Sequence, residues 1–154
     1  MRQIPRGQRH EFRVYPESRH GLYYVVRIFD TSRAMCARIR ECGRTPGRGT
    51  LAIVMPWRTA SYDRRWKTGK FAGEAMFLAR TAGNEVVAHE SGHIALAWAR
   101  RMGFAGHILD EAQPVRAHAP VMQARDSPEE RFCYALGRID KQIIGGLYDC
   151  GVFK

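Results

Sequence analysis

The chain has 154 residues, enough for one domain with one hydrophobic core, and its 45% hydrophobic and 26% charged residues are ordinary for a globular protein. No apolar run approaches the roughly 20 residues of a membrane span, and residues 1–9 lack the apolar stretch of a secretory signal. We therefore expect one cytoplasmic domain over residues 1–154, with residues 1–9 as a flexible arm and no membrane partner. The four cysteines form no C-x-x-C pair, which favours reduced thiols at Cys36, Cys42, Cys133 and Cys150.

The net charge of +10 is unevenly placed along the chain. Residues 1–70 hold sixteen Lys and Arg against five Asp and Glu, whereas residues 71–154 hold nine against ten. A solvated basic surface explains this excess most simply. The alternative is a surface that attracts nucleic acid or an acidic protein.

The first third of the chain predicts a β-hairpin followed by a helix. Residues 11–15 alternate apolar and polar side chains, and residues 22–29 are rich in β-branched and aromatic side chains, so both segments predict strands. Thr31 then suits the N-cap of a helix that runs to about Cys42, and Gly43 suits its end.

The middle of the chain predicts two further strands around an irregular segment. The continuous apolar run at residues 51–55 favours a buried central strand, and residues 74–80 favour a strand just before the next helix. Between them, aromatic and basic side chains alternate irregularly. The simplest explanation is a loop whose tryptophans pack against the core. The alternative is that Arg64, Arg65, Lys67 and Lys70 form a patch that binds nucleic acid or an acidic partner.

The sequence His89-Glu90-Ser91-Gly92-His93 has the form H-E-x-x-H. On a helix, residues four apart lie above one another, so His89 and His93 can offer two imidazole nitrogens to one metal ion. Glu90 lies beside them in the position of a general base. This pattern predicts a zinc site in which His89 and His93 are ligands and Glu90 is catalytic.

Local end signals define two helices in the second half of the chain. The motif helix is expected from an N-cap at Asn84 to a stop at Gly103. Residues 104–127 look mostly irregular. A last helix opens at Ser127 as N-cap with Pro128 in its first turn, and it is expected to run to Gly145 and Gly146.

A catalytic zinc ion needs a third protein ligand. The motif with a third histidine six residues after the second would place it at position 99, which is alanine here, so that class is excluded. A carboxylate on the last helix or a histidine such as His107 are the remaining candidates.

The H-E-x-x-H motif followed by the segment from Glu129 to Gly137 resembles the gluzincin pattern, and more narrowly the small zincin-like metallopeptidases of phages and bacteria, including the ImmA/IrrE-like group. The resemblance implies an α+β zincin-like fold, in which a small mixed or antiparallel sheet packs on the H-E-x-x-H helix and on a second, C-terminal helix. It implies an edge strand before the motif helix and Glu130 as the third ligand. Glu129, His107 and Asp110 are alternative ligands.

The function expected from these features is a zinc-dependent metallopeptidase that hydrolyses peptide bonds of a protein or peptide substrate. Glu90 would act as general base, and Tyr134, His118 or His107 would stabilise the oxyanion. The strand at residues 74–80 could pair with an extended substrate. The alternative is a binding or regulatory protein on a zincin scaffold that uses its basic N-terminal half.

Overall fold

A four-stranded mixed sheet forms the centre of the domain. The computed structural model describes residues 7–56, 70–108 and 127–154. The strands are β1 (Gln8–Val14), β2 (Tyr23–Phe29), β3 (Ala52–Pro56) and β4 (Phe71–Leu78), and their order across the sheet is β1-β2-β4-β3. Strand β2 pairs with β1 antiparallel and with β4 parallel, and β3 pairs with β4 antiparallel.

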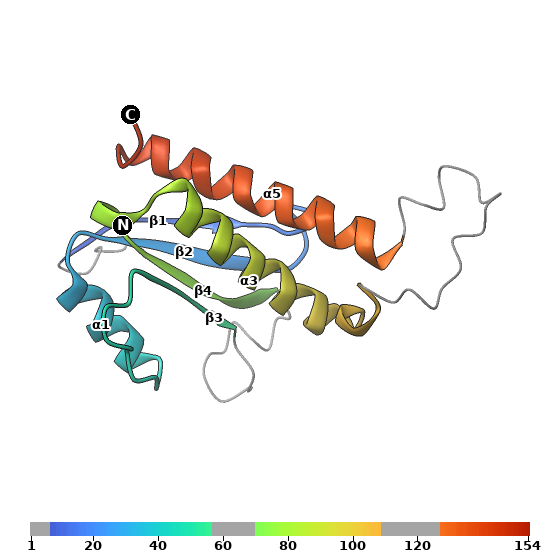
Figure 1. Cartoon of the computed structure of the whole chain (residues 1–154), viewed down its shortest axis with the longest axis horizontal. Coiled ribbons are helices and arrows are strands. Elements are labelled where there is room, and N and C mark those ends of the chain that lie inside the picture. Colours follow the sequence, from blue (N-terminus) through green and yellow to red (C-terminus); the bar gives the residue numbers. More distant parts are fainter. Residues whose placement is uncertain (1–6, 57–69, 109–126) are drawn as a thin grey trace.

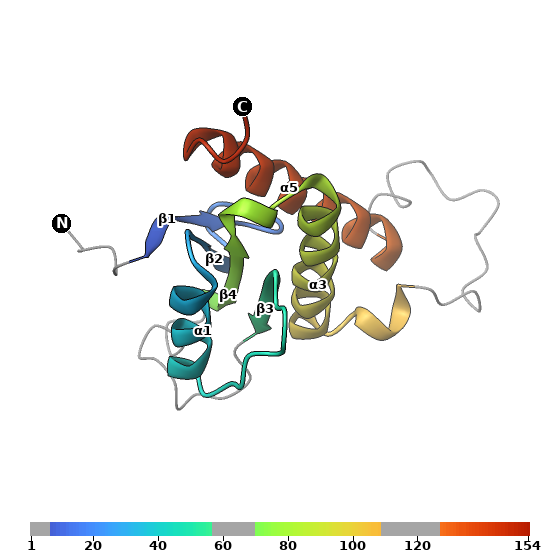
Figure 2. The same ribbon diagram turned by 60° about the vertical axis from the view of Figure 1, so that its left-hand side comes forward.

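In the described part of the chain, three helices cover the two faces of this sheet. Helices α3 (Asn84–Met102) and α5 (Pro128–Asp149) lie on one face, and α1 (Ser32–Glu41) lies on the other (Figures 1 and 2). Two short 3-10 turns, Ala79–Thr81 and Ala105–His107, precede and follow α3. The predicted α+β class is therefore confirmed. In the described part of the chain, no helix combines the length and apolar character needed to span a membrane.

The predicted hairpin is confirmed, but the predicted arm is too long. Strand β1 already begins at Gln8, whose buried side chain accepts a hydrogen bond from Arg27 Nη1 at 3.3 Å. The carbonyl of Gly7 also accepts from the backbone N–H of Asp30 at 3.0 Å. These contacts tie residues 7–9 to the sheet; residues 1–6 lie outside the described part.

The predicted positions of the third and fourth strands in the sheet are wrong. Strand β4 was expected at an edge before the motif helix, but it lies between β2 and β3 and is buried along its whole length. Strand β3 was expected at the centre, but it pairs only with β4 among the described strands. Its apolar run is still explained, because Ala52 and Val54 pack toward the α3 side and Ile53 and Met55 toward the α1 side.

A buried ion cluster explains why β4 can carry a charge at the centre of the sheet. Glu74 has a side-chain exposure of only 3%, and it accepts hydrogen bonds from both Arg27 of β2 and Arg38 of α1. Arg27 also pairs with Glu11 on β1. Burial alone would raise the pKa of Glu74, but the two guanidinium groups outweigh it and lower that pKa.

Most of the predicted helix ends are confirmed. Thr31 Oγ1 accepts from the N–H of Ala34 and Ser127 Oγ from that of Glu130, both at 3.2 Å. Gly103 ends α3 with φ of 84°, a left-handed conformation that glycine adopts without strain. The N-cap of α3 is Gly83 and not the expected Asn84, which is the first helical residue. Helix α5 continues past Gly145 and Gly146 to Asp149, so the predicted end was three residues too early.

Side-chain hydrogen bonds fix α5 on the domain. Gln142 pairs with the backbone of Tyr15, accepting from its N–H and donating to its carbonyl, both at 3.0 Å. Ser91 on α3 donates to Asp140 on α5 at 3.2 Å. Because the two helices run antiparallel, this last bond sets which residues of α5 stand opposite the motif (Figure 1).

Candidate metal centre

Helix α3 separates its apolar face from the face that carries the two histidines. Val87, Ile94 and Ala95 are fully buried against the sheet and α5. His89 and His93 lie on the other side of the helix and are exposed. Their Nε2 atoms are 3.0 Å apart, and their rings meet edge to face with centroids 4.7 Å apart.

This pair of imidazoles fits two positions of a zinc coordination shell. Two nitrogens bound at about 2.0–2.1 Å to one tetrahedral zinc ion lie about 3.3 Å apart. The observed separation of 3.0 Å between the Nε2 atoms of His89 and His93 is close to this value. The two Nε2 atoms are hydrogen-bonded to each other in this structure, and they are close enough together for one ion to contact both.

Glu90 sits beside the histidines at the border of the core. Glu90 is only 6% exposed, yet it lines the same groove as the imidazoles of His89 and His93. Burial raises the pKa of the Glu90 carboxyl, and the nearby His93 and His89 oppose that rise. No side-chain hydrogen bond to Glu90 occurs among the described residues, so its carboxyl is free to act in the groove.

The groove lies between α3 and the edge strand β3 and has a volume of about 320 Å³. Helix α3 contributes His89, Glu90, His93 and Arg100, and β3 contributes Ala52, Val54 and Pro56. The carbonyl of Leu51 accepts from Leu78 of β4, and backbone groups alternate in direction along an antiparallel strand. The N–H and C=O groups of Ala52 and Val54 therefore point away from β4, toward the open side of β3.

The structure does not bring the predicted third ligand to the histidines. Glu129 and Glu130 are exposed in the first turn of α5, and His107 is exposed beyond the end of α3. Within the described ranges, no group of three His, Cys, Asp or Glu side chains is placed to hold a metal ion. The alternative ligand Asp110 lies outside the described residues.

The register of the two helices explains this separation. Asp140 stands opposite Ser91, and Glu130 precedes Asp140 by ten residues, which is about 15 Å along a helix. Arg131, next to Glu130, instead lies over the rings of Trp98 and Phe104 at 5.4 and 5.0 Å from their centroids. The start of α5 is thus level with the end of α3, beyond the H-E-x-x-H turn.

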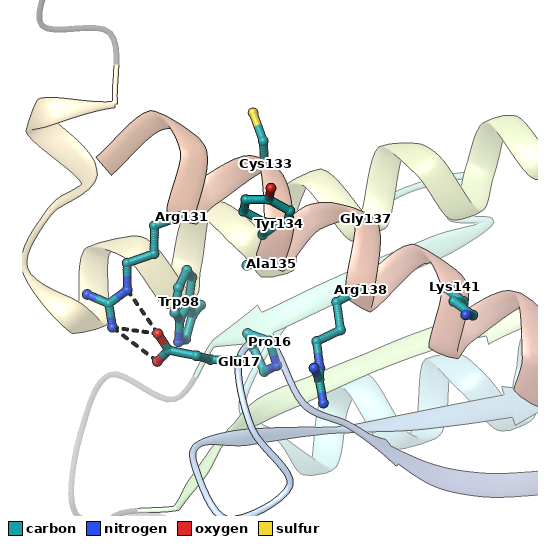
Figure 3. A pocket seen from close by; sticks show the side chains of 10 residues that line it. All are labelled: Pro16, Glu17, Trp98, Arg131, Cys133, Tyr134, Ala135, Gly137, Arg138 and Lys141. Atoms are coloured by element: carbon teal, nitrogen blue, oxygen red, sulfur yellow. Dashed lines mark hydrogen bonds and ion pairs between the residues drawn. The ribbon is translucent and has the colours of Figure 1, made fainter. Parts of the chain in front are cut away.

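Tyr134, predicted as an oxyanion stabiliser, lies at a different pocket. It is 61% exposed and lines a hollow of about 540 Å³ between α5 and the β1–β2 connection, together with Arg131, Arg138 and Glu17 (Figure 3). Arg131 forms two hydrogen bonds of 3.0 Å with the Glu17 carboxylate there. Tyr134 does not line the groove that contains His89 and His93.

Several other predicted residues fall outside the described part of the chain. One is His118, a predicted oxyanion stabiliser. The others are three of the four residues of the predicted basic patch, Arg64, Arg65 and Lys67. The fourth, Lys70, is exposed directly before β4, and its carbonyl accepts from the N–H of Tyr23 at 2.8 Å.

Two contributors to the groove were missed at the sequence level. One is β3, whose place at the sheet edge depends on pairing partners that periodicity does not reveal. The other is Arg100, which follows His93 by seven residues and therefore falls on the same helix face. That spacing is readable from the sequence and was a usable signal.

Comparisons of this chain with protein-family models, with curated proteins and with solved structures found no match.

Proposed function

We propose that this protein is a zinc-dependent hydrolase that cleaves peptide bonds in the groove between α3 and β3. The observation that carries the proposal is the convergence of the His89 and His93 Nε2 atoms, 3.0 Å apart, with the Glu90 carboxyl in the same groove. Two imidazole ligands and a general-base carboxylate on one helical turn are the part of a hydrolytic zinc site that the H-E-x-x-H motif supplies.

Each side chain has a definite task in this proposal. His89 and His93 would hold the ion through Nε2, whereas Glu130, the third ligand implied by the sequence, lies about ten residues along α5 from the level of the motif and is not given this role. Zinc, when bound, supplies Lewis acidity to a carbonyl oxygen and to water. Glu90 would accept a proton from the attacking water and then donate it to the leaving amine.

The edge of β3 would hold the substrate across this site. The sequence-based proposal that residues 74–80 pair with the substrate is wrong, because β4 is already hydrogen-bonded on both sides. The open N–H and C=O groups of Ala52 and Val54 lie along the same groove as the histidines. An extended peptide added there would gain backbone hydrogen bonds and pass over the H-E-x-x-H turn.

Metal analysis combined with three variants tests the proposal. We expect about one zinc ion per chain in the native protein, loss of zinc in His93→Ala, and full retention in His20→Ala, an exposed histidine of the β1–β2 connection. Glu90→Gln should keep zinc but lose cleavage of a random peptide mixture, because Glu90 is a base and not a ligand. Glu85→Gln, an exposed carboxylate in the first turn of the same helix, should keep both. Native protein that binds no zinc, or Glu90→Gln protein that cleaves normally, would overturn the proposal.

A further inference from the structure

Arg100 is a cation in the candidate catalytic groove, and no carboxylate of the described residues pairs with it. Arg100 is exposed, and it lines the groove together with His93 and β3. Among the described residues, no carboxylate forms an ion pair with it. A guanidinium group that faces a groove without a partner is available to an anion brought by the ligand.

The helical spacing places Arg100 in line with the metal ligands. Seven residues after His93 correspond to a rotation of about 20° and a rise of about 10 Å, so His89, His93 and Arg100 share one line along α3. Side chains on a helix lean toward its N-terminus, which brings the guanidinium of Arg100 back toward His93. Between them the groove floor is formed by Leu96 and Ala97, which offer no hydrogen bonds from their side chains.

Resting on the function proposed above, we propose that Arg100 binds a carboxylate of the peptide substrate roughly two or three residues from the cleaved bond, since an extended chain advances about 3.3 Å per residue. The carboxylate is either an Asp or Glu side chain or the free C-terminus of the peptide. Arg100 is thus a specificity residue that sets the register of the substrate along β3.

The chemistry of the groove favours a peptide over a nucleic acid. The wall opposite Arg100 is the edge of β3, where the backbone groups of Ala52 and Val54 pair with no described strand and suit another extended backbone. Among the described residues, no Phe, Tyr or Trp lines the groove to stack on a base. A single guanidinium beside a strand edge therefore matches one carboxylate on an extended peptide.

Arg101 provides a matched control. It has the same charge and lies in the same last turn of α3, where both arginines oppose the negative end of the helix dipole. Arg101 does not line the groove, and its charge instead lowers the pKa of the buried Tyr24 against the larger effect of burial. A loss seen in Arg100→Gln but not in Arg101→Gln therefore reports the position of the charge.

The first measurement reads the cleavage sites of zinc-loaded protein in a random ten-residue peptide mixture by mass spectrometry. We expect enrichment of Asp and Glu, or of the C-terminus, at one position about two or three residues from the cut. The ratio of kcat/KM for acidic over neutral peptides should fall about tenfold in Arg100→Gln, the value of a charge-assisted hydrogen bond. Arg100→Glu should select Lys and Arg at that position, and Arg101→Gln should leave the ratio unchanged. Pairs of peptides with free and amidated C-termini identify which carboxylate is bound.

The second measurement separates this proposal from the peptidase proposal. Fluorescence anisotropy of labelled acidic and neutral peptides with Glu90→Gln protein, compared with Glu90→Gln/Arg100→Gln, measures binding without turnover. A preference for the acidic peptide that depends on Arg100 supports the assignment even if no peptide is cleaved, whereas absence of cleavage alone contradicts only the peptidase. An unchanged preference in the double variant, an equal loss in Arg101→Gln, or Arg100-dependent binding of a single-stranded oligonucleotide in place of the acidic peptide would overturn it.

Discussion

The ring of Phe12 on β1 lies directly against the backbone of Gly146 on α5. A Cβ atom added to Gly146 would come within 2.2 Å of the Phe12 ring, far closer than any side-chain contact. The glycine is therefore what lets α5 approach β1, and it serves packing within the helix and not a helix end.

We expect Gly146→Ala to lower the free energy of unfolding by about 1–3 kcal/mol, because the extra methyl group forces the ring or the helix to move. The neighbouring Gly145→Ala is the control. A Cβ atom at Gly145 meets no described atom within 4 Å, so alanine there should stabilise the helix by roughly 0.5–1 kcal/mol. Denaturant unfolding of both variants measures the difference. Equal effects from the two substitutions would contradict the close approach.

The carboxylate of Glu74 should make stability depend on acid pH. Because the pKa of Glu74 is lowered in the folded state, its contribution is fully present above its unfolded pKa of about 4.3. That contribution is lost as the pH falls through the lower, folded value. We expect urea midpoints of the native protein to fall below about pH 4.5, with a smaller fall in Glu74→Gln.

At neutral pH, Glu74→Gln should also lower the free energy of unfolding by about 3–5 kcal/mol, since it leaves two arginines without their buried anion. Glu41→Gln is the comparison, because Glu41 also pairs with Arg38 at 3.0 Å but its side chain is 63% exposed. That substitution should cost at most about 1 kcal/mol. A large loss in both variants would show that Arg38, and not the burial of Glu74, controls stability.

Glu130 provides a test of the register between α3 and α5. With Glu130 about 15 Å along α5 from the level of Ser91, we expect Glu130→Gln to bind zinc as tightly as the native protein. Glu129→Gln is the matched control in the same turn, and competition with a chelating dye measures both affinities. A selective loss of affinity of tenfold or more in Glu130→Gln would restore the sequence prediction and would require α5 to shift when the metal binds.

The features predicted correctly from the sequence are those set by neighbouring residues. The caps at Thr31 and Ser127 depend on a hydroxyl and an N–H three residues away, and the His89–His93 spacing depends on one helical turn. The strand order depended on distant residues. The edge position of β4 was expected only from the resemblance, and the arginines that let Glu74 lie in a central strand are 47 and 36 residues away in the chain.

The same distinction applies to the candidate site. His89, Glu90 and His93 come together because they share a helical turn, which the motif alone predicts. The positions of Glu130 and Tyr134 depend on the register of α5 against α3. The hydrogen bond between Ser91 and Asp140 that fixes this register has no sequence signature. Tyr134 consequently faces the hollow beside Glu17 and Arg131.

The two hydrogen bonds between the backbone of Tyr15 and the side chain of Gln142 have a consequence for the order of events during synthesis. The two partners are 127 residues apart, so the ribosome must have reached Gln142 before the bonds can form. Until then the β1–β2 hairpin presents Tyr24, Val26 and Ile28 without the helix residues Ile139, Ile143 and Leu147 that complete their core. Folding of this domain therefore cannot be completed until α5 has been made, and the nascent hairpin is the stretch that a chaperone would need to shield until then.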